Sequence, residues 1–491
     1  MKLIRTHLVL LASALLPLAG SAQSRLGGEL TPPGAPTGPT MRTLDQIDAR
    51  IPIGVVGGDN SSVAIVNPGS YVLLGPIAAG DAVTALTISS SDVTIDLNGF
   101  TLSSTDSLGT ANGISLANNV RNVTIRNGII RGNIVFSGGA FTGTGFVTGI
   151  YGNNCTSVRV VDVAVSAVRS AGIRFTGASS ANTLVDRCTA STCGITGIEA
   201  TTVTGCVVRE CGTTGISAEL VSGCRAEIVN PANSSSAAIV ATLVNDSTGI
   251  GGDAGAGIMC TTATNSIGTS TVAYGLSASS AATNCRGTTS IGDSGLNAGS
   301  AVGCMGVNTS GANGLYASTA MNCRGVNNSG ANGLWATNTA SDSTGSTSTG
   351  SCGLRSVTAL NCTGSNGTGA YAIRATTATG CTGETNGAIA IFAEVATACY
   401  GGAYGNNATA GTAGISAKIA TNCTATNFST NATGSWGIKV DGTATACRAA
   451  RPNATTTGIA IQAFTAVACN VESGVITVSG TGSSKQLGTY P

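Results

Sequence analysis

Short runs of alternating apolar and polar residues recur along most of the chain from residue 85 onward. Early examples are Leu86–Ile88, Val93–Leu97 and Val123–Asn127, and the turn Asn98-Gly99 follows the second of them. A period of two is typical of β-strands with one buried face, and Asn-Gly is typical of tight turns. We therefore expect many short strands joined by tight turns.

The pattern becomes a near-literal repeat further along the chain. The segment Cys304–Ala317 returns almost unchanged as Cys323–Ala336, a shift of 19 residues. Within a unit, an Ile or Leu is followed two positions later by a small residue, five later by Ala or Val and eight later by Cys. The last position of the unit recurs at residues 188, 206, 224, 247, 266, 285, 304, 323, 343, 362, 381, 399, 423, 447 and 469. Such a series predicts a solenoid of stacked coils.

The spacing of these units, 18 to 24 residues, distinguishes two kinds of solenoid. A left-handed β-helix built on hexapeptides should keep to multiples of six, whereas a right-handed parallel β-helix tolerates loops of different lengths. We therefore predict an all-β fold, a right-handed parallel β-helix of roughly 18 coils spaced by about 4.8 Å, with a short N-terminal cap.

Two early segments, Asp92–Leu102 and Val120–Ile130, resemble the opening coils of pectin-lyase-like proteins, the right-handed β-helix repeat superfamily of secreted bacterial proteins. The resemblance covers residues 85–480 as a fold, and its motifs are structural. Such folds carry polysaccharide lyases, glycoside hydrolases, adhesins and proteins without known activity, so the fold leaves the function open. The glycoside hydrolases of this fold resemble one another in Asn-Thr-Asp, Asp-Asp and Gly-His-Gly motifs, and none of these occurs here.

The first 22 residues have the features of a secretory signal peptide. Lys2 and Arg5 precede the apolar run Leu8–Leu18, and small residues end the segment. No later stretch approaches the roughly 18 uninterrupted apolar residues of a membrane span, so we expect no membrane insertion. The protein should therefore be secreted, into the medium or onto the cell surface.

The rest of the chain divides by composition. We expect that Thr43 caps a short helix through Leu44, Ile47 and Ile51, which would shield the first strand edges. The predicted parts are a signal peptide (1–22), a Pro-rich linker (23–42), an N-terminal cap region (43–84), the β-helix (85–480) and a C-terminal tail (481–491).

Charge and histidine content exclude several functions. The chain has 23 basic and 22 acidic residues, and loss of Lys2 and Arg5 with the leader leaves a net charge near −1. Nucleic-acid binding needs a basic excess, so no nucleic-acid partner is expected. The only histidine, His7, lies in the leader, which excludes a Ser-His-Asp triad, a Cys-His pair and a histidine zinc site in the mature chain.

The chain has 17 cysteines, and twelve of them occupy the last position of the repeat. That position holds serine at Ser247, Ser266 and Ser343, which favours a ladder of buried thiols over disulfides. In-register neighbours would also have parallel Cβ vectors, which would have to converge for a disulfide. Cys193 and Cys211 form a second, shorter stack and are the best disulfide candidates. Identical thiols in a line do not make a tetrahedron, so no metal site is predicted.

Asp92 and Asp96 are candidate catalytic carboxylates, because paired acids act in glycoside hydrolysis. The turn that follows them offers a simpler role. In this segment Asp96 and Asn98 should point away from Ile95 and Leu97 and bond turn amides. We therefore favour a structural role for these side chains.

The residue after each repeat Ile or Leu should face outward, and in five successive coils it is Tyr316, Trp335, Arg355, Arg374 or Phe392. Glu394 lies two residues beyond the last of them. Flat rings stack on sugar faces and guanidinium groups bind carboxylates, so a polysaccharide or cell-surface glycan could lie along this file.

We predict a secreted or cell-surface glycan-binding or structural, adhesive scaffold without catalytic activity and without a cofactor. The alternative is a polysaccharide lyase of the pectate-lyase-like type acting on an acidic polysaccharide. In that case Arg355 or Arg374 would be the base or the carboxylate clamp, with Glu394 as an auxiliary group. Ca²⁺ would be a cofactor only for the lyase, and acidic residues to hold it are sparse. The sequence does not indicate whether the protein is a monomer or an oligomer.

Overall fold

The computed structural model describes residues 50–53, 62–229, 236–253, 255–405, 411–430, 434–453 and 459–479. The predicted signal peptide, Pro-rich linker and C-terminal tail lie outside these residues. The described residues form strands and turns, without any helix. They therefore contain no helix long and apolar enough to cross a membrane.

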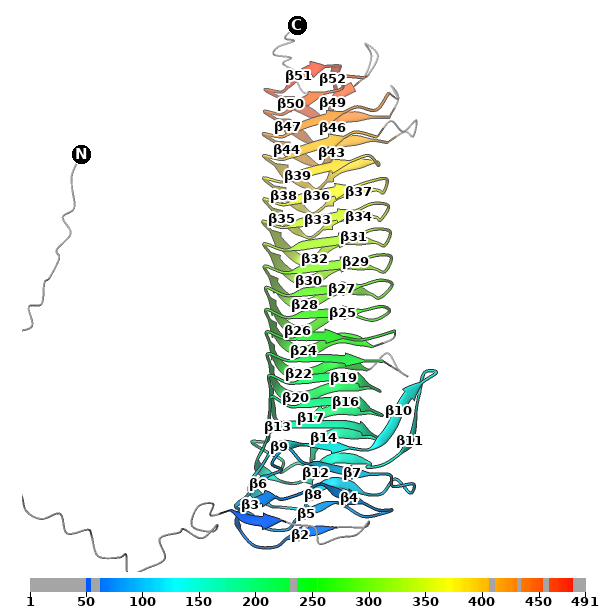
Figure 1. The fold of residues 1–491 in the computed structure, drawn as a ribbon. Coiled ribbons are helices and arrows are strands. Elements are labelled where there is room, and N and C mark those ends of the chain that lie inside the picture. Colours follow the sequence, from blue (N-terminus) through cyan, green and yellow to red (C-terminus); the bar gives the residue numbers. More distant parts are fainter. Residues whose placement is uncertain are drawn as a thin grey trace, which may run out of the picture. The chain divides into compact units, whose positions relative to one another are not determined.

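The strands stack in parallel files, as predicted. Strand β30 (Asn313–Met321) pairs in parallel with β28 (Ser294–Val302) in the coil before it and with β32 (Asn332–Ser341) in the coil after it. A second file runs through β27 (Arg286–Thr289), β29 (Met305–Asn308) and β31 (Arg324–Asn327). Repeated along the chain, these pairings form an all-β parallel solenoid of about twenty turns (Figure 1).

The register keeps equivalent residues of successive repeats opposite one another. Leu296, Leu315 and Leu334 are register partners, and all three are fully buried. Ala320 and Ala340 are likewise partners in the same core. The repeat seen in the sequence is therefore one coil of the solenoid, with its Leu and Ala side chains in the central core.

The N-terminal part corrects one prediction. Ile51 lies in strand β1 (Ile51–Ile53), which pairs in parallel with β3 (Gly69–Leu73), so the helix predicted to reach Ile51 is wrong at that residue. The alternation of Ile51, Pro52 and Ile53 suits an edge strand, where the missing N–H of Pro52 is tolerated. The other residues predicted for that helix, Thr43, Leu44 and Ile47, lie outside the described residues.

The coils begin before residue 85. Three strands lie between β1 and residue 85, namely β2 (Val63–Ile65), β3 and β4 (Ile77–Ala79). They pair in register with three strands of the next coil, β5 (Leu86–Ile88), β6 (Val93–Asp96) and β7 (Thr101–Ser104). Residues 63–79 therefore form a coil of the solenoid within the stretch predicted as the cap.

One hairpin departs from the parallel pattern. Strands β10 (Asn133–Ser137) and β11 (Ala140–Thr144) form a separate antiparallel pair that projects from the stacked coils (Figure 1). Phe136 and Phe141 are cross-strand partners whose ring centroids lie 4.7 Å apart. An isolated hairpin is marginally stable, and this aromatic pair stabilises it.

A repeated corner turn explains the last position of the repeat. The residue before it has a left-handed backbone, with φ of 52° at Asn284, 62° at Gly303 and 52° at Asn322. Gly and Asn adopt this conformation most readily, which accounts for their frequency at this position. The next residue, such as Cys285 or Cys304, then points into the core and is 2% exposed.

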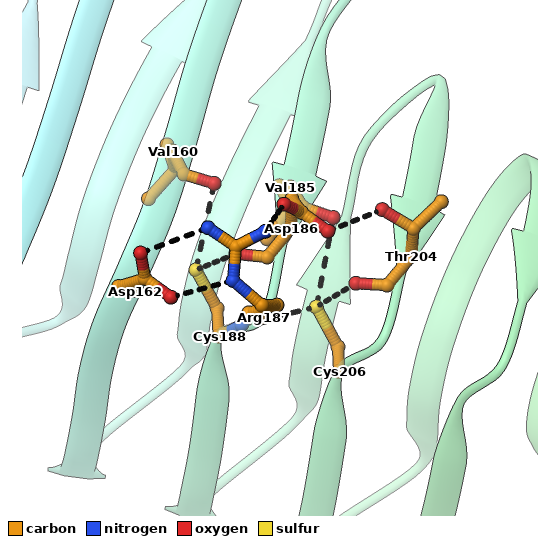
Figure 2. Close-up of polar contacts among 8 residues, drawn as sticks. All are labelled: Val160, Asp162, Val185, Asp186, Arg187, Cys188, Thr204 and Cys206. Atoms are coloured by element: carbon orange, nitrogen blue, oxygen red, sulfur yellow. Dashed lines mark hydrogen bonds and ion pairs between the residues drawn. The ribbon is translucent and has the colours of Figure 1, made fainter.

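The ladder thiols satisfy backbone groups at this corner. In Figure 2, Cys188 Sγ donates to the carbonyl oxygens of Asp186 at 3.3 Å and Val160 at 3.5 Å. The Cys188 backbone N–H donates in turn to Cys206 Sγ at 3.4 Å. Ser247 acts in the same way, because its hydroxyl donates to Asn245 O at 2.6 Å and accepts the Cys224 N–H at 3.1 Å. The position therefore needs a small side chain that both donates and accepts.

The 17 cysteines are free thiols in the structure. Cys193 and Cys211 are register partners on β16 (Thr189–Cys193) and β19 (Val207–Cys211), and both are fully buried. They stack as predicted, and a disulfide between them stays a prediction. Burial raises the pKa of the Cys260 thiol to about 12 and that of the Cys352 thiol to about 11, so these two stay protonated at neutral pH.

Candidate functional site

The predicted outward file occupies five adjacent strands. Tyr316 on β30 and Trp335 on β32 are followed by Arg355 on β34 (Cys352–Arg355), Arg374 on β37 (Tyr371–Arg374) and Phe392 on β40 (Ile389–Phe392). Each is the register partner of the next. Each also follows a fully buried Leu or Ile, so alternation along the strand turns its side chain outward.

Four of these side chains line one shallow hollow of about 380 Å³. Small residues, among them Ala336 and Ala375, also line it, while the larger side chains come from successive coils. Glu394 lies in the same hollow. The structure therefore brings together the residues predicted for the glycan or lyase site except Tyr316, which contacts Trp335 beside it. These residues are Trp335, Arg355, Arg374, Phe392 and Glu394.

One end of the hollow is built around Trp335. The Tyr316 and Trp335 rings meet edge to face, with centroids 5.1 Å apart and planes at 83°. The guanidinium carbon of Arg355 lies 4.6 Å from the Trp335 ring centroid, in a cation–π contact. Trp335 is therefore held by one neighbour in each direction along the solenoid.

The other end repeats this arrangement with a residue that the sequence analysis missed. Tyr371 begins β37, and its ring centroid lies 5.3 Å from that of Phe392 and 5.5 Å from the Arg374 guanidinium carbon. The signal available in the sequence was an aromatic residue three positions before Arg374. It was missed because the repeat alignment followed a single outward position in each coil.

The acidic residue of the hollow is paired. Lys418 Nζ lies 2.7 Å from Glu394 Oε1, and both side chains are more than half exposed. Lys418 was not predicted, since it lies 24 residues from Glu394 and meets it only because the coils stack. With this pair neutralised, Arg355 and Arg374 leave the hollow positively charged.

Ser356 adds an unsatisfied polar group to the same hollow. It is 8% exposed, and its hydroxyl oxygen is buried without a hydrogen-bond partner among the described residues. Buried polar groups are nearly always hydrogen-bonded, so the Ser356 hydroxyl is an exception beside the hollow. Ser356 was not predicted, because nothing in its sequence context separates it from many surface serines.

The carboxylate of Asp96 bonds the turn after β6. It accepts the Asn98 backbone N–H at 2.8 Å and an Asn127 amide N–H at 3.1 Å. It also forms ion pairs with Arg50 at 2.9 Å and Arg126 at 3.1 Å. These contacts agree with the structural role predicted for it.

Two further observations bear on other sites. A larger hollow of about 750 Å³ lies beside the base of the β10–β11 hairpin, lined by Arg131 and Asn133 among smaller residues. Among the described residues, no group of three or more His, Cys, Asp or Glu side chains is placed to hold a metal ion. The hollow at Trp335 therefore remains the best-built candidate, because it combines rings, cations and an unsatisfied hydroxyl.

Comparison with known proteins adds little to this description. No protein-family model matches the chain, and no curated protein matches it. A solved structure similar to part of it is the catalytic domain of a GH87 alpha-1,3-glucanase in complex with tetrasaccharides. The match has 12% identity and a TM-score of 0.14, and it covers 88% of this chain and 62% of that one, less than two thirds of its length. Similarity this weak carries no argument about function, so what is established is a parallel β-solenoid.

Proposed function

We propose that this chain is a secreted glycan-binding scaffold of the pectin-lyase-like type, and that its ligand lies in the hollow at Trp335. The observation that carries the proposal is that side chains from four successive coils line one hollow. Adjacent coils are about 4.8 Å apart, so the distance from Trp335 to Phe392 is roughly 14 Å along the solenoid. That length suits a short oligosaccharide rather than a single sugar.

The chemistry of the hollow favours an acidic glycan. Aromatic rings offer flat faces for sugars, and the two guanidinium groups offer paired donors for carboxylate or sulfate. The Ser356 hydroxyl could bond a sugar only after its side chain rotates toward the hollow, because its oxygen is buried. Because Glu394 is neutralised by Lys418, it does not repel an anionic ligand.

A glycan-array screen of the mature chain, residues 23–491, tests this proposal. We expect binding to acidic oligosaccharides, a loss of about tenfold or more in Trp335→Ala, and unchanged binding in Phe464→Ala. Phe464 is a matched control, since it is 53% exposed and lies outside the hollow. Equal binding by all three proteins would show that the glycan binds outside this hollow. No binding by the parent chain would contradict glycan binding and favour a purely structural scaffold.

A lyase is the second candidate function, and one observation favours it. Arg374 is exposed in the hollow, where its guanidinium could reach the proton next to a uronate carboxyl. Lyase action on a uronate polymer would produce an unsaturated sugar that absorbs in the ultraviolet, and Arg374→Ala would abolish it. We expect no such absorbance, with or without Ca²⁺, whereas its appearance would establish catalysis.

Secretion is part of the same proposal and has its own test. The predicted leader ends at residue 22, so the exported protein should begin at Gln23. N-terminal sequencing of protein from the culture medium or from the cell surface would show this. An intact Met1 in a protein kept inside the cell would contradict secretion.

A further inference from the structure

The ladder contains runs of cysteines in consecutive coils. Two runs have three members each, namely Cys188, Cys206 and Cys224, and Cys285, Cys304 and Cys323. One run has six members, namely Cys362, Cys381, Cys399, Cys423, Cys447 and Cys469. All are between 0% and 3% exposed. No part of the proposed glycan hollow involves these thiols.

Neighbouring thiols of a run have equivalent surroundings. Cys381 Sγ donates to Thr379 O and to Ala359 O, both at 3.4 Å. Cys399 Sγ makes the corresponding contacts with Thr397 O at 3.3 Å and Ala378 O at 3.4 Å. Two side chains with the same partners in adjacent coils are related by a shift of one coil. Their sulfur atoms should therefore be separated by about 4.8 Å, the spacing between strands.

That separation suits a bridging metal ion better than a disulfide. A disulfide would need the two sulfurs to converge to about 2.05 Å, although their side chains are parallel. Two metal–thiolate bonds of about 2.3 Å laid end to end span roughly 4.6 Å. Since the side chains stand across the solenoid axis, an ion between two sulfurs would also meet each Cβ–Sγ bond near a right angle.

The ligand set narrows the choice of ion. Among the described residues no three potential ligands converge, so a tetrahedral site of the zinc type does not arise. Two thiolates facing each other along a line suit soft ions that accept linear two-coordination, which are Cu(I), Ag(I) and Hg(II). Hard ions such as Ca²⁺ and Mg²⁺ need several oxygen ligands.

We propose that pairs of adjacent ladder thiols bind a soft cation in linear two-coordinate geometry. Each thiol loses its proton to solvent as its sulfur bonds the ion, and no electron is transferred. With Hg(II) the product is a neutral bis-thiolate and two protons, whereas a monovalent ion leaves one buried negative charge. Burying a net charge is costly, so Hg(II) should bind more tightly than Ag(I).

Adjacency sets the number of sites. The run of six offers three separate pairs, each run of three offers one, and Cys193 with Cys211 offers one more, which makes six in all. Removing Cys381 and Cys423 would leave a single pair in the run of six. Removing Cys362 and Cys381 would leave two pairs in that run. The two double variants lack the same number of thiols but should differ by one site.

Serine is the suitable replacement, because it already occurs in the ladder. The Ser343 hydroxyl donates to Ser341 O at 2.7 Å and to Ala320 O at 3.4 Å. These contacts correspond to those of Cys323 Sγ with Met321 O at 3.2 Å and Ala301 O at 3.3 Å. Cys-to-Ser variants should therefore fold, which thermal unfolding of each variant would verify.

The experiment is native mass spectrometry of the reduced mature protein after exposure to Hg(II) acetate and then to excess glutathione. We expect up to six retained ions, each with loss of two protons, and X-ray absorption showing two sulfur neighbours per ion. Cys381→Ser/Cys423→Ser should lose two ions and Cys362→Ser/Cys381→Ser one. Cys260→Ser, which removes a cysteine outside the ladder, should lose none.

Several results would overturn the proposal. Equal losses in the two double variants would show that adjacency does not matter. One ion per thiol, three sulfur neighbours per ion, or complete removal by glutathione would each exclude bridged pairs. Tighter retention of Ag(I) than of Hg(II) would contradict the charge argument.

Discussion

The early coils, which precede the first repeat position at residue 188, and the regular coils, which follow it, share one topology but pack their cores differently. In the early coils several large side chains fill each turn, such as Leu86, Ile88 and Ile95, all at most 1% exposed. In the regular coils a single leucine is joined by small residues. Leu315, for example, is buried in the same core as the small residues Ala320 and Cys323.

Glycines in the regular coils let facing strands approach closely, so that little side-chain volume is needed to fill the core. A Cβ on Gly314 would lie 2.4 Å from Val326 N, and a Cβ on Gly306 would lie 2.2 Å from Gly314 O. The facing strands of the regular coils therefore approach backbone to backbone. The early coils rely on buried apolar volume, whereas the regular coils rely on close backbone approach and on ladders of Asn and Cys that bond the turns.

This difference matters for the outer surface. Because successive regular coils are nearly identical, outward side chains such as Trp335, Arg355 and Arg374 fall into one line. The early coils carry longer insertions, including the β10–β11 hairpin, which interrupt such lines. A continuous hollow is therefore expected where the core is most repetitive.

Gly314→Ala tests whether the regular coils depend on close backbone approach. Its Cβ would clash with backbone atoms of Val326 and Gly333, which cannot move aside without opening the sheet. We expect destabilisation of at least about 3 kcal/mol, visible as faster hydrogen exchange in the surrounding coils. Gly75→Ala is the control, because no atom lies within 4 Å of its Cβ position, and its stability should be unchanged.

A large-to-small change tests the early core. Ile95 is fully buried, so Ile95→Ala should cost about 2–5 kcal/mol through lost burial and the cavity left behind. Ala320→Gly, in the regular core, should cost only about 1–2 kcal/mol, because it removes one methyl group and adds backbone freedom. Denaturant unfolding would measure both changes. Equal costs would mean that the two regions do not differ in how they are stabilised.

The asparagine ladder is the third test. Asn327 Nδ2 donates to Gly311 O at 2.9 Å and Ala312 O at 3.0 Å, and its Oδ1 accepts the Gly330 N–H at 2.7 Å. Asn327→Ala should therefore cost about 1–3 kcal/mol by leaving buried groups unpaired. Asn327→Thr should cost less, because its register partner Thr347 is a threonine whose hydroxyl accepts the Gly350 N–H at 2.9 Å. Thermal unfolding of the two variants would rank them.

A weaker effect should be an acid dependence of the early coils, caused by Asp106. Burial alone would raise the pKa of Asp106, but four backbone N–H groups donate to its carboxylate and hold the pKa below its usual 3.8. The unfolded chain therefore takes up the proton first, and this stabilisation is lost as the pH falls below 3.8 and through the folded pKa.

Hydrogen exchange would locate this effect. Protection of Thr110 and Ala111, whose N–H groups bond Asp106 at 3.0 and 3.1 Å, should fall in acid before that of the regular coils. In Asp106→Asn this acid dependence should disappear. Uniform loss of protection along the solenoid would contradict a local role for Asp106.

Much of the site followed from the repeat, but not all of it. Strand alternation alone placed Trp335, Arg355 and Arg374 on one outward line, since their spacing follows the coil period. The roles of Lys418 and Ser356 could not be predicted from the sequence. Whether Lys418 meets Glu394, or whether the Ser356 hydroxyl is left unsatisfied, depends on contacts between coils that no local pattern records.

The repeat pattern was enough to predict the all-β class, the stacked parallel coils and the in-register ladder, because a repeat constrains every coil in the same way. The folded structure was needed to show that residues 63–79 belong to the coils, that Ile51 is in a strand, and that the outward file borders a hollow. The difference follows from the range of the interactions. Alternation and turn chemistry act between neighbours in the sequence, whereas edge pairing, close backbone approach and side-chain contacts across coils join residues that are far apart along the chain.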